Sequence, residues 1–302
     1  MKVGLILPLF SGDPAKVLAA AREAESLGFD GVFAFDHFFP PGGPRDRPAL
    51  EAFASLAGVV AVTRRVKVGT LVARANLRPP GLLAKAASWL DTASGGRMVL
   101  GIGTGDPIDR PEHDAYGLPM LNKRDRRTYL EETVTAAKAL FAGKSYPGGS
   151  WIPPLSGPLK PSPSRPGGPP VWIGAQADDV VRLAGRIADG WNGWGLDPSS
   201  FARKVAVLRG AAGGHPVEAS WAGIVLAGAD RAETESLLER RRARGMDDEA
   251  WVGSTDELVR FMQALAEAGA GWVVMVLAGP ADRRHLLAER VLPAIRSPSM
   301  AD

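Results

Sequence analysis

The chain contains no cysteine, and this absence excludes disulfide bonds, thiolate metal ligands and a cysteine nucleophile. Only four histidines are present, and His113, His215 and His285 lack the spacing to carboxylates that metal binding requires, so no metal ligand is predicted. The G-x-S-x-G, H-E-x-x-H and Walker patterns are also missing. The sequence therefore offers no signature of a serine hydrolase, a zinc protease or a P-loop enzyme.

An excess of one charge and a long apolar run are lacking too. The 36 basic and 33 acidic residues are scattered, without a basic stripe interleaved with aromatics, and this argues against a nucleic-acid partner. No run approaches the roughly 18 apolar residues of a membrane span. The first residues, MKVGLILPLF, break at Pro8 without a small-residue cleavage site and fit a buried strand better than a signal peptide. We expect a soluble, cytoplasmic protein.

Strand-like and helix-like segments alternate along the 302 residues, as in a parallel α/β sheet with helical crossovers. The strand-like segments are residues 2–8, 31–35, 66–72, 98–102, 171–174, 190–194, 219–227 and 272–277. Eight units predict one (β/α)8 (TIM) barrel domain over residues 1–302, with insertions after strand four and before strand five and an extra segment before strand eight. A doubly wound sheet is the alternative, but the first turn, 8–12, lacks the G-x-G-x-x-G fingerprint.

Helices are predicted by apolar residues at helical spacing and by Gly and Pro at the segment ends. The predicted helices are residues 14–27, 49–62, 80–93, 123–141, 178–188, 199–211, 232–243, 255–268 and 281–295. Two irregular stretches interrupt the pattern. One is a loop of about 13 residues from Pro107 that carries Glu112, His113 and Tyr116, and loops of this length are usually functional or disordered. The other is the Pro- and Gly-rich segment 143–170, which we interpret as an excursion over the site.

The stretch 97–109, RMVLGIGTGDPID, is the strongest local candidate for a site. An apolar strand ends at Gly103, Thr104 and Gly105, where glycine lets the backbone approach a planar ligand, and Asp106 is the nearest titratable group. A plain strand-to-loop turn is the alternative, because Gly-x-Gly after a strand is a weak signal.

In a barrel, the loops after the strands converge on one face, so residues far apart in sequence gather there. The residues concerned are Asp36, His37, Asn76, Asp106 and the turn Gly174, Ala175, Gln176 and Ala177. A histidine at a strand end can exchange a proton near neutral pH, although a buried, structurally satisfied histidine is also compatible with the sequence. Asp36 would orient His37 or cap its loop. The turn after Gly174 leads into a helix whose free N–H groups suit a phosphate, with a tight structural connection as the alternative.

Three segments together resemble the bacterial luciferase-like flavin- and deazaflavin-dependent oxidoreductases. They are AREAESLGFDGVFAFDHF at 21–38, RRVKVGTLVARANLRPPGLLAKAASWLDTASGGRMVLGIGTGD at 64–106 and PPVWIGAQADDVVRLAGRIADGWN at 169–192. The resemblance implies a (β/α)8 barrel with insertions, a homodimer, and a flavin or deazaflavin ring at the carboxyl ends of the strands. We expect the dimer to use helices 49–62 and 80–93, which are apolar around more of their circumference than one core face requires.

The pairing of Asp36-His37-Phe38 with the turn 103–106 is most similar to the branch that uses coenzyme F420. This resemblance implies that His37 lies at the ring and that Asp106 donates or accepts a proton, although the sugar-phosphate dehydrogenases carry glutamate there. It also implies a non-proline cis peptide at Leu71-Val72. The cofactor residues that it implies are Asp36, Thr70, Leu71, Val72, Gly103, Thr104, Gly105, Gly174, Ala175, Gln176 and Ala177, the last four holding the phosphate.

The predicted function is therefore hydride transfer between F420 and a small organic substrate. A monooxygenase that uses reduced FMN and oxygen is the alternative enzyme, since the same barrel serves both. A non-catalytic flavin-binding protein is the alternative outside enzymes, and the presence of His37 and Asp106 argues against it. The substrate is left open, because the pocket walls are expected to come from loops 40–48, 107–122 and 143–170, which contain no readable motif.

Overall fold

Eight parallel strands form a closed barrel in the computed structural model, which describes residues 1–41, 43, 45–246 and 249–296. The strands pair in the order β1-β2-β3-β4-β5-β6-β7-β9, and β9 pairs with β1 to close the ring. Their bounds are β1 Lys2–Ile6, β2 Gly31–Ala34, β3 Lys67–Arg74, β4 Met98–Gly103, β5 Val171–Gly174, β6 Gly190–Trp194, β7 Glu218–Gly228 and β9 Trp272–Leu277. The predicted TIM barrel is confirmed, and its eight predicted strands are these eight.

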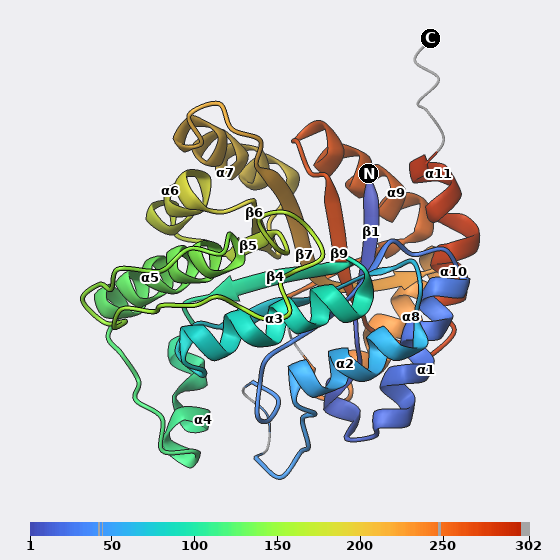
Figure 1. Cartoon of the computed structure of the whole chain (residues 1–302). Coiled ribbons are helices and arrows are strands. Elements are labelled where there is room, and N and C mark those ends of the chain that lie inside the picture. Colours follow the sequence, from blue (N-terminus) through green and yellow to red (C-terminus); the bar gives the residue numbers. More distant parts are fainter. Residues whose placement is uncertain (42, 44, 247–248, 297–302) are drawn as a thin grey trace.

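Helices surround the barrel as an outer layer (Figure 1). They are α1 Pro14–Ser26, α2 Ala52–Val62, α3 Pro80–Ser94, α4 Arg110–Ala115, α5 Lys123–Phe141, α6 Asp178–Ile187, α7 Pro198–Ala211, α8 Arg231–Arg242, α9 Thr255–Glu267, α10 Arg283–Arg290 and α11 Leu292–Arg296, with short 3-10 turns η1 Leu9–Ser11 and η2 Pro107–Asp109. The helix predicted over 281–295 is divided into α10 and α11. In the described part of the chain, no helix combines the length and the apolar character that crossing a bilayer would need.

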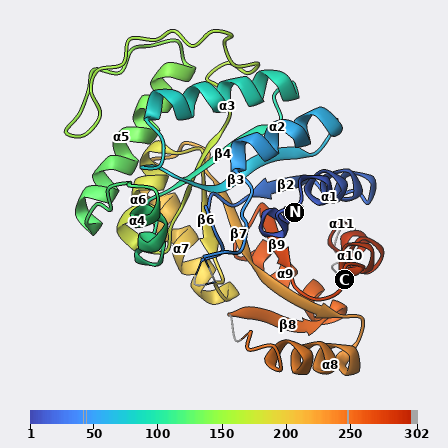
Figure 2. The ribbon, with the colours of Figure 1, turned by 90° about the horizontal axis from the view of Figure 1, so that it is seen from below.

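A ninth strand, β8 (Ala250–Ser254), lies in the extra segment before the last barrel strand and was not predicted. β7 is 11 residues long, and its first half pairs with β6 through Glu218–Ala222. Beyond the end of β6, residues Ile224–Gly228 of β7 pair with β8. Figure 2 shows β8 and α8 side by side at the margin of the barrel. Five residues between charged segments gave too short a pattern for prediction.

The segment 143–170 does not cover the site, which corrects the prediction. It packs along the outside of α3 and α5: Ser88 Oγ donates to the Pro161 carbonyl at 3.1 Å, and Arg165 pairs with the buried Asp91 at 3.0 Å. The reason is topological. α5 runs back along the barrel, so its last residue lies near the amino ends of the strands, where β5 begins.

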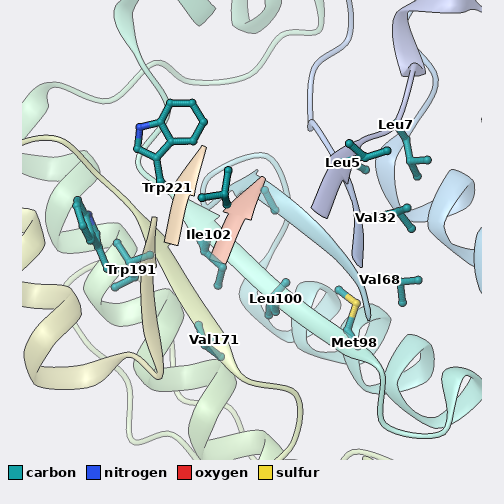
Figure 3. Packing of buried hydrophobic residues seen from close by; sticks show 14 of the residues in the cluster. Leu5, Leu7, Val32, Val68, Met98, Leu100, Ile102, Val171, Trp191 and Trp221 are labelled. Atoms are coloured by element: carbon teal, nitrogen blue, oxygen red, sulfur yellow. The ribbon is translucent and has the colours of Figure 1, made fainter. Parts of the chain in front are cut away.

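Two apolar clusters fill the inside and the outside of the strand ring. Between strands and helices lies the larger cluster, which includes the labelled side chains of Figure 3, among them Leu100, Ile102 and Trp191. Inside the ring, the rings of Phe33, Trp172 and Trp272 lie 5.8 to 6.1 Å apart, centroid to centroid. This packed interior forms a solid floor beneath the carboxyl ends of the strands, so a ligand can enter only from that face.

Candidate active site

A cavity of about 1930 Å³ opens at the carboxyl ends of the strands. On the β2 to β6 side it is lined by His37, Leu71, Val72, Arg74, Gly103 to Asp109, Gly174 to Ala177, Asn192 and Trp194. The loops after successive strands thus converge as a barrel requires. Most ligand pockets occupy roughly 300–1,000 Å³, so this cavity has room for two ligands.

His37 follows β2 directly and is held by a carboxylate from the loop after β4. Its Nδ1 lies 2.8 Å from Glu112 Oε1, and the backbone N–H of Phe38 donates to Glu112 Oε2 at 2.5 Å. The Glu112 side chain is 1% exposed, whereas that of His37 is 19% exposed. The imidazole is therefore anchored from the protein side and reaches the cavity with its other edge.

Arg74, at the end of β3, completes the network around Glu112. Its Nη2 donates to Glu112 Oε2 at 2.8 Å, and its Nε donates to the carbonyl of Asp36 at 3.0 Å. Asp109 stands beside this pair, with Oδ1 3.9 Å from His37 Nδ1 and Oδ2 3.7 Å from Arg74 Nη1. Charges buried in this way are stable only when they are mutually paired.

The charge state of Glu112 follows from these contacts. Burial by itself raises the pKa of this carboxyl, but the hydrogen bonds from His37 and from the Phe38 N–H, with the positive charges of His37 and Arg74, lower the pKa below its ordinary value. Glu112 is therefore an anion and can only accept hydrogen bonds. Nδ1 of His37 must then carry the proton of this bond, which leaves Nε2 as the ring nitrogen that is turned away from Glu112.

Asp36 supports the network from behind. Arg78 donates two hydrogen bonds to the Asp36 carboxylate, at 2.6 and 2.9 Å, and the backbone N–H of Arg74 donates a third at 3.1 Å. Burial by itself lowers the pKa of the Arg78 guanidinium, but its contacts with Asp36 and with Glu51, the latter at 2.6 Å, outweigh this effect and raise the pKa. Asp36 is 3% exposed and does not line the cavity.

The predicted cis peptide at Leu71-Val72 is confirmed, and the pairing of β3 with β4 shifts register between Thr70 and Ala73. Val72 projects where neighbouring strands carry glycine. A Cβ on Gly103 would lie 2.7 Å from Val72 Cγ2, and one on Gly174 would lie 2.8 Å from Val72 Cγ1. These glycines are thus required by the bulge itself, in addition to any ligand above it.

The turn after β4 places Asp106 on the surface of the cavity. Gly105 has φ +70°, a left-handed conformation that glycine adopts without strain. Its carbonyl accepts a hydrogen bond of 2.9 Å from Arg126 Nη1, and the Asp106 N–H donates to Asp109 Oδ2 at 2.7 Å. The Asp106 side chain is exposed. The carboxylates that approach His37 Nδ1 are those of Glu112, at 2.8 Å, and Asp109, at 3.9 Å.

The turn after β5 leads into α6, as predicted. The residue before this helix, Ala177, provides no side-chain cap, and the Val180 N–H donates to Asp179 Oδ1 at 2.8 Å, so the N–H groups of Asp178 and Asp179 are left for solvent or a ligand. The acidic residues of the first turn are neutralised, since Asp178 lies 2.5 Å from Lys204 and Asp179 lies 2.7 Å from Arg127.

The structure brings most of the predicted site residues together. Lining the cavity are His37, Leu71, Val72, Gly103, Thr104, Gly105, Asp106, Gly174, Ala175, Gln176 and Ala177. Asp36, Thr70 and Asn76 do not line it: Thr70 is buried and donates to the Gly101 carbonyl at 2.7 Å, and Asn76 contacts the Pro119 carbonyl.

Sequence reasoning missed Arg74, Asp109 and Glu112 as site residues. The signal for the two acids was available, because they lie three residues apart at the spacing of one helical face in a long loop after a strand. The loop contains η2 and α4, which were not predicted, and α4 carries Glu112. Arg74 gave no such signal, because an arginine at the end of a strand is as often exposed to solvent as it is part of a buried ion pair.

Three potential ligand atoms, from His37, Asp109 and Glu112, lie within 4.8 Å of one another. The guanidinium of Arg74 already contacts this group at 2.8 Å from Glu112 and 3.7 Å from Asp109. A divalent cation would have to displace that positive charge or tolerate it. The contacts therefore favour an organic site over a metal centre, and the absence of a metal ligand stays a prediction.

Comparison with known proteins identifies the family. The family model described as luciferase-like monooxygenase matches residues 1–296. The chain belongs to the luciferase-like monooxygenase family. Two curated relatives are named F420-dependent glucose-6-phosphate dehydrogenase. The one from Beutenbergia cavernae is 32% identical over 183 residues, covering 59% of this chain and 52% of the relative. The one from Nakamurella multipartita is 35% identical over 185 residues, covering 59% and 51%.

This luciferase-like chain thus matches about half the length of these relatives. Its fold also resembles an F420-dependent secondary alcohol dehydrogenase in complex with an F420-acetone adduct, with a TM-score of 0.84, 18% identity and coverage of 98% of this chain and 99% of the other. The EDTA monooxygenase of Chelativorans sp. BNC1 gives a TM-score of 0.83 at 16% identity, with coverage of 98% and 94%. At these identities the structures establish the shared barrel.

Proposed function

We propose that the protein is an F420-dependent oxidoreductase that transfers a hydride between the deazaflavin and a small organic substrate. The observation that carries the proposal is His37 at the rim of the cavity, bonded to the buried Glu112 beside the Leu71-Val72 bulge, with Arg74 donating to the same carboxylate. The names of the curated relatives support the choice of F420.

The residues present fit a flat tricyclic ring. Val72, Gly103 and Gly174 line the cavity as a surface without protruding polar groups. Arg74 Nη1 is buried and, within the described residues, has no hydrogen-bond acceptor, so a ring carbonyl can take that role. The first two N–H groups of α6, those of Asp178 and Asp179, and the turn 174–177 suit the cofactor phosphate.

When bound, the deazaflavin supplies the carbon that gives or takes the hydride. Oxidation of an alcohol also releases a proton, and reduction of a carbonyl consumes one. We assign that proton to His37 Nε2. Glu112 keeps a proton on Nδ1, so Nε2 is the nitrogen that can accept another, and the Glu112 carboxylate stabilises the imidazolium that then forms. Asp106 is exposed on the cavity wall, and we propose that its carboxylate stabilises the charge that develops at the ring during hydride transfer.

Equilibrium titration with F420 and with FMN under matched conditions tests the cofactor. We expect F420 to bind more tightly. If FMN binds at least as tightly, the FMN monooxygenase becomes the better assignment, and if neither flavin binds, the proposal of a flavin-type enzyme fails altogether.

Asp106→Asn tests the second role. We expect turnover per bound cofactor to fall while cofactor affinity and thermal stability hold, with one limb of the pH–rate profile lost. If affinity and stability fall together while turnover per bound cofactor stays near wild type, Asp106 only shapes the turn.

We also propose a homodimer that uses α2 and α3. Two large apolar side chains of α3 are exposed, Leu82 at 64% and Trp89 at 48%, and they lie seven residues apart on one helix face. Sedimentation equilibrium at micromolar concentration tests this, with Trp89→Glu expected to yield monomers. A monomeric wild type would remove the idea. A cytoplasmic location and the lack of a nucleic-acid partner stay predictions.

A further inference from the structure

The cavity extends well beyond the residues assigned to the cofactor. A second part of it, which we call the α8 arm, is lined by six apolar side chains and by arginines of α8 and the turn after it. The apolar side chains are Ile224, Leu226, Leu237, Met246, Val276 and Leu277. They come from β7, α8, β9 and the segment before β8, so the arm occupies the β7 and β9 side of the barrel mouth.

The α8 arm is unlike the His37 side in its lining. Its walls are aliphatic side chains and a methionine that is 45% exposed. Such a surface gains free energy by covering hydrocarbon and offers a sugar few hydrogen bonds. The lining therefore selects a ligand with an apolar body.

Among its described lining residues, the α8 arm carries charge of one sign. Arg240 and Arg244 line it, are exposed, and form no ion pair with any described residue; Arg240 bonds only Ser236 Oγ, at 2.9 Å. The lining acids Asp106, Asp109 and Asp179 all belong to the segments around β4 and α6. Two further arginines line it, Arg241 and Arg284, and Arg284 is already paired with Glu23 at 2.6 Å. Two cationic groups thus stand over an apolar wall without a carboxylate among its described lining residues.

Barrel order separates this arm from the proposed phosphate position. The turn 174–177 follows β5, whereas the arm lies at β7 and β9, two and three strands further round the ring. A cofactor whose phosphate sits at α6 leaves the arm free. The arginines of α8 that line the arm are therefore available to a second ligand.

We propose that the α8 arm binds the substrate and that the substrate is an amphipathic anion, with an apolar body on Ile224, Leu226 and Val276 and an anionic head at Arg240 and Arg244. The claim that this ligand is the substrate rests on the proposed function, but binding of the anion can be tested without cofactor. It also distinguishes this chain from an enzyme for a sugar phosphate, which has a polar body.

The test uses the fluorescent apolar anion 8-anilinonaphthalene-1-sulfonate and its displacement by decanoate from the full-length protein without cofactor. We expect decanoate to displace the dye, decan-1-ol to do so more weakly, and glucose 6-phosphate to leave it in place. Decanoate binding should weaken as salt is raised, because exposed charges are screened.

Substitutions on α8 provide a matched comparison. Arg240→Gln with Arg244→Gln should weaken decanoate binding about tenfold, the combined effect of two exposed ion pairs, and leave decan-1-ol binding unchanged. Arg242→Gln removes the same charge from the last turn of α8 at a residue that does not line the cavity, and should change decanoate binding less than twofold. Val276→Thr should weaken the acid and the alcohol alike.

Two results would overturn the inference: equal effects of the Arg240/Arg244 pair and of Arg242, or displacement by glucose 6-phosphate as effective as by decanoate. Either would leave the F420 titration untouched. Conversely, failure of the protein to bind F420 would remove the proposed reaction while the decanoate site stood.

Discussion

The His37 side of the cavity and the α8 arm differ in where their polar groups find partners. Around His37, the charges are buried and satisfy one another: Glu112 accepts from His37, from the Phe38 N–H and from Arg74, while Asp36 accepts from Arg78. At the α8 arm, Arg240 and Arg244 are exposed and form no ion pair with a described residue. The protein thus fixes the geometry at one end itself and leaves charge at the other end for a ligand.

His37→Asn should give the largest effect, because it removes the proposed proton carrier while keeping a polar side chain of similar size. We expect kcat with F420 to fall about 10²- to 10⁴-fold. F420 affinity should stay within about threefold, since a cofactor draws its binding from many contacts. Single-turnover kinetics with a bound-cofactor measurement separate the two. A kcat within a few-fold of wild type would make His37 structural and erase the proposed difference between the two ends.

Glu112→Gln tests the same end through stability. Removing one partner of a buried charge pair typically costs about 3 to 5 kcal/mol, because the other charge is left without compensation. Arg74 would be that charge, so we expect the free energy of unfolding to fall by about 3 kcal/mol in urea denaturation. Arg240→Gln is the control at the α8 arm and should change it by about 0.5 kcal/mol or less. Equal losses would contradict the comparison.

The pH dependence of that loss has a defined sign. The pKa of Glu112 is lowered in the folded protein from the ordinary 4.5, so its stabilising contribution is fully present above that value and is lost as pH falls through the folded-state pKa. The stability difference between wild type and Glu112→Gln should therefore be constant from neutral pH down to about 5 and shrink below 4.5. Urea midpoints from pH 3.5 to 7 measure it, and a difference that grows toward acid would exclude the assigned charge state.

Gly105→Ala should have the smallest effect and sharpens the view of the turn. An alanine at its φ of +70° costs about 1 kcal/mol, and its Cβ would lie 3.2 Å from Asp109 Oδ2. Gly117→Ala is matched, with φ +65° in the same loop and open space around the Cβ. Both variants should lose about 1 kcal/mol of stability in urea, but only Gly105→Ala should also lower kcat. A kcat loss for both would mean that loop rigidity matters rather than Asp109.

The features that could be predicted are those whose sequence pattern lies within one continuous segment of the chain. Alternating apolar strands and helices predict the barrel, and the family resemblance predicts the cis peptide at Leu71-Val72. His37 and the turns 103–106 and 174–177 follow strands directly, and a barrel must bring strand ends together.

The remaining features depend on contacts between segments. Arg74 owes its role to acids 35 and 38 residues further along the chain, and no local pattern records that pairing. Segment 143–170 was assigned to the site by composition, whereas its course is set by where α5 ends and by the buried Asp91 that holds Arg165. β8 depends on β7 continuing past β6, a property of strand length in three dimensions.

Because β7 extends past β6, changes in the segment that carries β8 can occur separately from changes in the strands that close the barrel. Residues up to Ala222 pair with β6, and Ser220–Val225 pair with β9 to close the ring, whereas Ile224–Gly228 also carry β8 on the edge that β6 leaves open. Sequence between β7 and β9 can therefore be exchanged or extended while β2, β3 and β4, which position His37, Arg74 and the loop that carries Glu112, keep their registers. A chimera that receives the 229–270 segment of another barrel would replace Leu237, Arg240, Arg244 and Met246 of the α8 arm and keep the residues around His37 unchanged.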